Sequence, residues 1–288
     1  AQGLQNIGII NRKLGKYEEA LSYLKNALDI KESNNPNDST MLADCYEDIG
    51  VVYYYQGKYQ MALEMFAKAV DWIKNSNKQA TLSKRYNSIG NVYERTGEYA
   101  KAMDFLNRSL AMKKEIYGEL HPTIATTMNN IGIVASRDGD DSAAIKFFNE
   151  ALTMRLKIFG ISHTSVADSY NNLGIIYFNK KDYQQSSEYY LKALTIYENI
   201  LGKNHPRIAS CCNNIGLSYE KMGNHETALL FLLRGLEIRM SSLRTNHPSI
   251  ADSYLNIAMI HFNKKDFHNA LEYYEKACVI YESVYKEK

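Results

Sequence analysis

The chain has 288 residues, of which 45% are hydrophobic and 23% charged, and its 34 basic and 32 acidic residues leave a formal net charge of +2. This length exceeds what one hydrophobic core usually organises, so we expect several domains, a barrel or a repeat array. The balanced charge excludes a basic nucleic-acid platform, and the longest apolar run, at about 228–233, is far shorter than the roughly 18 residues of a membrane span. Four cysteines without a C-x-x-C pair favour a reducing, cytoplasmic compartment.

A three-residue string, most often Asn-Ile-Gly, recurs along the whole chain. Its small third residue stands at 8, 50, 90, 132, 174, 216 and 258, so the spacings are 42, 40, 42, 42, 42 and 42. Taking this residue as position 8 divides the chain into repeats 1–42, 43–82, 83–124, 125–166, 167–208, 209–250 and 251–288. Such a period predicts a repeat array, and positions below are counted within each repeat.

Each repeat carries two helical patterns separated by a turn. Positions 4, 7, 8 and 11 are mostly apolar, aromatic or small, which is the spacing of one face of a helix, here named helix A. Glycine follows at position 15 in five repeats, where a left-handed residue would end that helix. Apolar residues at positions 20, 21, 24, 27 and 28 then predict a longer helix B.

Small residues at positions 8 and 20 indicate where the two helices meet. A glycine inside a helix costs about 1 kcal/mol relative to alanine, so its repetition suggests a helix crossing too close for a side chain. Tyrosine at positions 11 and 17 is expected to fill the space beside this crossing. The sequence therefore predicts an all-α solenoid of tightly packed helical hairpins.

Glycine at 8, tyrosine at 11, alanine at 20, an apolar residue at 24 and alanine at 27 resemble the tetratricopeptide repeat, whose usual unit has 34 residues. The longer unit adds a loop with His121-Pro122, His205-Pro206 or His247-Pro248, and this combination resembles the kinesin light chain type of repeat. The loops at 35–36 and 75–81 lack His-Pro, and the fifth repeat is preceded by His163-Thr164. The resemblance implies a right-handed superhelix whose inner surface is lined by helix A.

The sequence contains no recognisable catalytic, nucleotide-binding or metal-binding motif, so we expect a non-enzyme without cofactor or metal. The four histidines at position 39 are spread along the array and are interpreted as helix N-caps, with proline as first helical residue. We interpret Cys211 and Cys212 as packing residues. The array starts and stops without polar caps, which predicts a segment of a longer protein or end-to-end self-association.

If positions 4, 7, 8 and 11 face the core, positions 5, 6, 9, 12 and 13 lie on the outer face of helix A. Position 9 is apolar in six repeats, which predicts either a ligand-binding floor or contact between neighbouring A helices. Positions 5 and 6 carry a ladder of amides that could bind the backbone of an extended peptide or, alternatively, hydrogen-bond neighbouring repeats. These amides are Asn87, Asn129, Asn130, Asn171, Asn172, Asn213, Asn214 and Asn256.

The exception at position 9 is Asn91, which lies on one helical face with Lys84, Asn87 and Arg95. Arg137 occupies the position of Arg95 in the next repeat, and the preceding repeat contributes Tyr54 and Tyr55. An aromatic ledge beside these cations predicts binding of an acidic peptide with an apolar anchor, although the charges could also be merely solvated. Kinesin light chain-like grooves, which take acidic peptides with an aromatic residue, imply a similar ligand.

These observations favour a protein-interaction scaffold or adaptor that binds a protein or peptide, and not a nucleic acid or a membrane. A static subunit of a cytoskeletal or ciliary assembly is one alternative, and a regulatory array attached to a catalytic domain outside this chain is another. The expected location is the cytoplasm, with the cytoskeleton or cilium as more specific sites.

Overall fold

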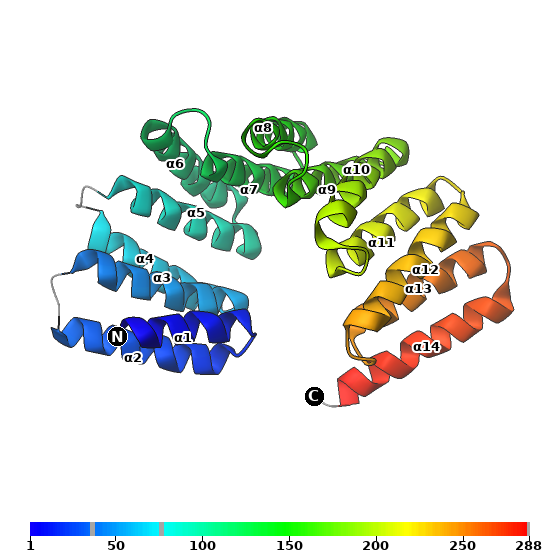
Figure 1. Ribbon diagram of the computed structural model, residues 1–288, viewed down its shortest axis with the longest axis horizontal. Helices are drawn as coiled ribbons and strands as arrows, with labels where there is room; N and C mark the ends of the chain where they lie inside the picture. Colours follow the sequence, from blue (N-terminus) through cyan, green and yellow to red (C-terminus); the bar gives the residue numbers. More distant parts are fainter. Residues whose placement is uncertain (35–37, 75–77, 287–288) are drawn as a thin grey trace. The chain divides into compact units, whose positions relative to one another are not determined.

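The computed structural model describes residues 1–34, 38–74 and 78–286, and within these ranges it contains fourteen α-helices and no strand (Figure 1). The predicted all-α fold is therefore confirmed, and no helix in these ranges is long and apolar enough to cross a membrane. The helices are α1 (Gln2–Lys13), α2 (Tyr17–Asn34), α3 (Ser39–Tyr55), α4 (Tyr59–Ile73), α5 (Gln79–Thr96), α6 (Tyr99–Tyr117), α7 (Pro122–Asp138), α8 (Asp141–Phe159), α9 (Thr164–Asn179), α10 (Tyr183–Leu201), α11 (Pro206–Lys221), α12 (His225–Ser242), α13 (Pro248–Asn263) and α14 (Phe267–Lys286).

Odd-numbered helices correspond to helix A of each repeat and even-numbered helices to helix B. The chain divides into two compact units, residues 1–144 and 145–288. In the first unit α1, α3 and α5 pack on α2, α4 and α6, and in the second α9, α11 and α13 pack on α10, α12 and α14. Within each unit a helix B also contacts the helix A that follows, as α2 does with α3 and α10 with α11, so the hairpins stack.

The turn from helix A to helix B has the same backbone geometry throughout the repeats. Glycine at position 15 has a positive φ, from 73° at Gly57 to 91° at Gly139, as predicted. In the fifth repeat the amide of Asp182 donates to the carbonyl of Tyr177, and that of Lys181 to Phe178, which is the Schellman pattern. Lysine takes the left-handed position twice, at Lys181 (φ 64°) and Lys265 (φ 62°).

The predicted close crossing of helices A and B is confirmed by the surroundings of the glycines at position 8. A Cβ atom added to Gly8 would lie 2.6 Å from Cγ of Leu24 and 3.1 Å from the carbonyl oxygen of Ala20. At Gly174 the added atom would meet the ring of Tyr190, also at 2.6 Å. All three distances are shorter than ordinary van der Waals contact, so a side chain at Gly8 or Gly174 would force the facing helix or side chain to shift.

Histidine begins four of the A helices, as the sequence suggested. His121, His163, His205 and His247 are N-caps, and in each the ring Nδ1 accepts a hydrogen bond from the backbone amide two residues later. Proline follows directly in three of the four. The unusual first two loops include 35–37 and 75–77, which lie outside the described residues.

Apolar side chains are exposed on the first and last helices. Ile10 on α1 is 56% exposed, whereas Val52, at the same position of the next repeat, is fully buried beneath the preceding hairpin. Leu14 near the end of α1 and Leu271 and Val279 on α14 are also exposed. Self-association or continuation of the array at these faces stays a prediction.

Candidate functional site

The predicted site residues all lie on A helices, and the structure joins several of them across neighbouring repeats. Position 6 of one repeat hydrogen-bonds position 5 of the repeat before it. Asn130 Nδ2 donates to Asn87 Oδ1 at 3.4 Å, and Asn256 Nδ2 donates to Asn213 Oδ1 at 2.9 Å. The junctions Gln5–Asp48 (2.6 Å) and Glu47–Ser88 (3.2 Å) follow the same rule with other side chains.

This ladder favours the alternative interpretation of the asparagines, in which they hold neighbouring repeats in register. All eight asparagines are half-buried, whereas they would be exposed if this face of helix A pointed only to solvent. They are Asn87, Asn129, Asn130, Asn171, Asn172, Asn213, Asn214 and Asn256. Neighbouring A helices therefore cover part of the face that the periodicity alone assigned to solvent. A ligand-binding role for the same amides stays a prediction.

A second ladder joins position 13 of one repeat to position 12 of the repeat before it. Arg95 Nε donates to the Tyr54 hydroxyl at 3.1 Å, and Arg137 Nε lies 2.6 Å from Oε1 of Glu94. Asn263 Nδ2 donates to Oε1 of Glu220 at 3.1 Å in the second unit. Because positions 5 and 12 are two helical turns apart, the two ladders run along the same face of the A helices.

The predicted basic residues therefore have acidic partners that the sequence interpretation overlooked. Glu94 is buried and lies beside both Arg95 (3.5 Å) and Arg137 (2.6 Å). Lys84 lies 3.7 Å from Oε1 of Glu47. All three cations keep a large exposed fraction, from 43% for the Arg137 side chain to 68% for Lys84, so they still present positive charge to solvent.

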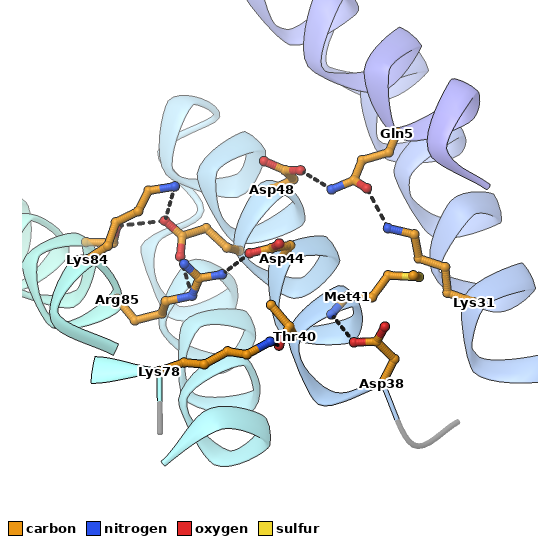
Figure 2. Close-up of polar contacts among 12 residues, drawn as sticks. Gln5, Lys31, Asp38, Thr40, Met41, Asp44, Asp48, Lys78, Lys84 and Arg85 are labelled. Atoms are coloured by element: carbon orange, nitrogen blue, oxygen red, sulfur yellow. Dashed lines mark hydrogen bonds and ion pairs between the residues drawn. The ribbon is translucent and has the colours of Figure 1, made fainter. Parts of the chain in front are cut away.

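A network of charged side chains joins the second repeat to the third (Figure 2). Arg85, which is 1% exposed, contacts Oε2 of Glu47 at 2.8 Å and Oδ1 of Asp44 at 2.5 Å. Arg85 stands at position 3 of its repeat, where the later repeats have a small residue. This departure from the pattern was the signal in the sequence that could have revealed the buried pair of Arg85 and Glu47. The network therefore fixes the α3–α5 junction beneath Lys84.

A second, separate network joins the first repeat to the second through Gln5, whose amide bridges two charged groups. Its Nε2 donates to Asp48 at 2.6 Å, and its Oε1 accepts from the buried Lys31 at 2.6 Å (Figure 2). Burial raises the pKa of the Asp48 carboxyl, while the hydrogen bond from Gln5 acts in the opposite direction. Cys45 lies beside this network, and burial raises the pKa of its thiol.

Between the two ladders, position 9 forms an apolar stripe that is interrupted by Asn91. There the structure contains a hollow of about 160 Å³, lined by Val51, Tyr54, Tyr55, Phe66, Ser88 and Asn91. Tyr55 is 55% exposed and packs edge to face on Tyr54, with ring centroids 5.6 Å apart. The predicted aromatic ledge thus borders a cavity, and Asn91 lies in its wall.

Cations at position 31 of the repeat, which lies on helix B, form a further contact between repeats that was not predicted; two of them are buried and Arg239 is half-buried. Lys113 donates to the hydroxyl of Thr127 at 2.6 Å, and Arg155 and Arg239 bond Ser169 and Ser253 in the same way. Burial lowers the pKa of Lys113 to about 8. The signal available in the sequence was the small hydroxyl at position 3 of the following repeat.

The adjacent cysteines of α11 lie in the core. Cys211 and Cys212 are buried, as the packing interpretation expected, and burial raises the pKa of both thiols, that of Cys212 to about 11. In the described ranges no group of three or more His, Cys, Asp and Glu side chains is placed to hold a metal ion.

Comparisons with known proteins agree with this architecture. Models of the tetratricopeptide repeat match residues 1–72, 81–157, 165–241 and 250–288. Protein KINESIN LIGHT CHAIN-RELATED 3 of Arabidopsis thaliana is 30% identical over 79 residues, which are 27% of this chain and only 12% of that protein.

Two solved structures share the fold at low sequence identity. BtubC (BKLC) from P. vanneervenii has a TM-score of 0.69 and 22% identity, over 79% of this chain and 93% of that one. A signal transduction ATPase with a tetratricopeptide repeat sensor from Pyrococcus horikoshii has a TM-score of 0.76 and 20% identity, over 99% of this chain and 43% of that one. The repeat matches cover most of the chain, which therefore belongs to the tetratricopeptide repeat family.

Proposed function

We propose that this chain is a protein-interaction scaffold whose first unit binds an extended peptide segment on the outer face of α3, α5 and α7. The hollow beside Tyr55 and Asn91 is the observation that carries the proposal. Its volume of about 160 Å³ is below the roughly 300 Å³ at which small-molecule sites begin, so it suits one apolar side chain of a larger partner. Tetratricopeptide repeat arrays are typical scaffolds of this kind.

The charges around the hollow favour an acidic segment. Lys84, Arg95 and Arg137 are exposed on α5 and α7, while their acidic partners Glu47 and Glu94 are buried beneath them. A carboxylate in solvent can therefore approach the cations from the side opposite to these partners. Because the cations are exposed, their contribution should be modest and should decrease as salt is added.

The asparagine ladder contributes hydrogen bonds that the contacts between repeats leave available. An asparagine amide has two N–H groups and one oxygen with two lone pairs. Asn87 accepts bonds from Thr127 and Asn130 through Oδ1, which leaves its Nδ2 hydrogens for a ligand carbonyl. Asn130 uses only Nδ2 in this contact, so its oxygen can accept from a ligand amide.

A single substitution that fills the hollow tests the proposal. Peptides selected from a random display library on the wild-type chain would be measured against Asn91→Ile by fluorescence anisotropy. Isoleucine is native to position 9 in three other repeats, so the variant should fold normally while its side chain occupies the cavity. We expect selected peptides to combine acidic residues with an aromatic or aliphatic anchor, and to bind the variant at least tenfold more weakly.

Met259→Ile at position 9 of the seventh repeat is the matched control and should leave binding unchanged. Peptides that bind the wild type and Asn91→Ile equally would contradict the assignment of the hollow. Absence of any selected peptide would instead favour the alternative in which whole surfaces dock in a static assembly.

A further inference from the structure

Two turns of the second unit share one sequence and one unusual backbone conformation. The segments 178–183 and 262–267 read Phe-Asn-Lys-Lys-Asp followed by tyrosine or phenylalanine. In both, the second lysine occupies the left-handed position that glycine takes in the other five repeats, with φ of 64° at Lys181 and 62° at Lys265. A side chain in this conformation is strained, whereas glycine is not.

Strain of this kind marks positions where a side chain has a use that outweighs local stability. Lys180, Lys181, Lys264 and Lys265 are all exposed, and none of them forms an ion pair with any other residue in the described ranges. Packing and internal charge pairing therefore do not explain why lysine replaces glycine at these turns. An external anionic group is a partner that exposed lysines without an internal ion pair can take.

Each lysine pair is accompanied by two aromatic rings. Phe178 and Tyr183 pack edge to face with centroids 5.3 Å apart, and Phe262 and Phe267 do so at 5.5 Å. The second pair is conspicuously open, because Phe262 is 53% exposed and Phe267 is 59% exposed. These turns thus offer positive charge and apolar surface side by side.

The positive charge along this edge is discontinuous. In the sixth repeat, between the two lysine pairs, Lys221 lies 3.1 Å from Oε2 of the buried Glu220. The whole chain carries a net charge of only +2. Such separated patches fit clusters of carboxylates better than the evenly spaced phosphates of a nucleic acid or the continuous surface of anionic lipid.

We propose that the turns 178–183 and 262–267 form a second binding edge, which receives an acidic, extended polypeptide carrying apolar residues. Its carboxylates would contact the two lysine pairs, and an apolar side chain would pack on Phe262 and Phe267. This edge belongs to the second unit and does not depend on the hollow beside Asn91.

The test uses a fluorescein-labelled peptide that repeats Glu-Glu-Phe, with fluorescence anisotropy as the readout, and every chain compared carries Asn91→Ile so that the hollow of the first unit is filled. The edge variant combines Lys180→Gln and Lys264→Gln with Lys181→Gly and Lys265→Gly, so the strained backbone is relieved and not disturbed. The control variant carries glutamine at four other exposed lysines of the same unit, which are Lys146, Lys157, Lys192 and Lys203. Both variants change the formal net charge from +2 to −2.

Each exposed ion pair contributes little, but the loss of four lysine–carboxylate contacts together should weaken binding of the peptide by the edge variant about tenfold or more. The control variant should retain most of its affinity. In addition, Phe262→Ser should weaken binding of this peptide but not of one that repeats Glu-Glu-Ser. Equal losses in the two lysine variants would overturn the proposal, because the effect would then be one of net charge. It would also be overturned if the chain carrying Asn91→Ile alone failed to bind the peptide, or if it bound only phosphatidylserine vesicles through these lysines.

Discussion

Replacing Gly174 by alanine tests whether the close helix crossing controls the stability of the array. The new Cβ would lie 2.6 Å from Cδ1 and Cε1 of Tyr190, so the ring has to recede until the separation reaches at least 3.4 Å. Tyr190 is itself buried, which leaves the ring little room to move. We expect overpacking to cost about 1–3 kcal/mol, and the better helix propensity of alanine to offset up to about 1 kcal/mol of this. Taking the middle of the overpacking range, about 2 kcal/mol, the net loss should be about 1–2 kcal/mol.

Urea unfolding would measure this loss, and hydrogen exchange would locate it. Exchange should accelerate mainly in α7–α12, the fourth to sixth repeats, because a repeat array transmits strain chiefly to neighbouring repeats. Gly3→Ala is a suitable control, since Gly3 lies in α1 and nothing lies within 4 Å of its added Cβ. That substitution should be neutral or stabilising by up to about 1 kcal/mol. A Gly174→Ala variant as stable as the wild type, or uniform acceleration over all repeats, would refute the reasoning.

Three further substitutions probe the buried charges and the strained turns. Lys113→Met should raise the unfolding free energy by about 1–3 kcal/mol at pH 7. The pKa of Lys113 falls from 10.5 to about 8 on folding, so the unfolded chain binds the proton more tightly than the folded chain. The stability of the wild type should therefore rise between about pH 8 and 10.5. The stability advantage of the methionine variant, measured by urea unfolding, should shrink over the same pH range. Arg85→Met should destabilise the chain by about 3–5 kcal/mol, because it leaves Glu47 buried without the partner that lies 2.8 Å away. Adding Glu47→Leu should recover most of this stability. If it does not, the broken ion pair is not the cause of the destabilisation. Lys181→Gly should stabilise the chain by up to about 1 kcal/mol in thermal unfolding, and a loss would argue against backbone strain at φ 64°.

Much of the fold was predictable because its determinants are local and periodic. The spacing of apolar positions specified two helices per repeat, glycine at position 15 specified the left-handed turn, and the His-Pro pairs specified the start of helix A. Seven copies of one pattern also allow little ambiguity about which face is buried. The glycines at position 8 even indicated the close helix crossing, where a Cβ atom added to Gly8 would lie only 2.6 Å from Cγ of Leu24.

The candidate site depended on tertiary structure, because its contacts join residues that are about 42 positions apart. Periodicity within one helix assigned Asn87 and Asn213 to the outer face, whereas stacking of the next A helix half-buries them and pairs them with Asn130 and Asn256. The acidic partner of Arg137 likewise comes from the preceding repeat.

The turns at Lys181 and Lys265 also separate what the sequence predicts from what only the structure shows. The sequence determined that a turn follows each helix A, but only the backbone shows that Lys181 and Lys265 adopt the conformation glycine would favour. Local sequence therefore determined the helices and their caps, because hydrogen bonds and side-chain spacing within a repeat decide them. Tertiary structure decided which polar groups remain available to a partner, because that depends on how successive repeats cover one another.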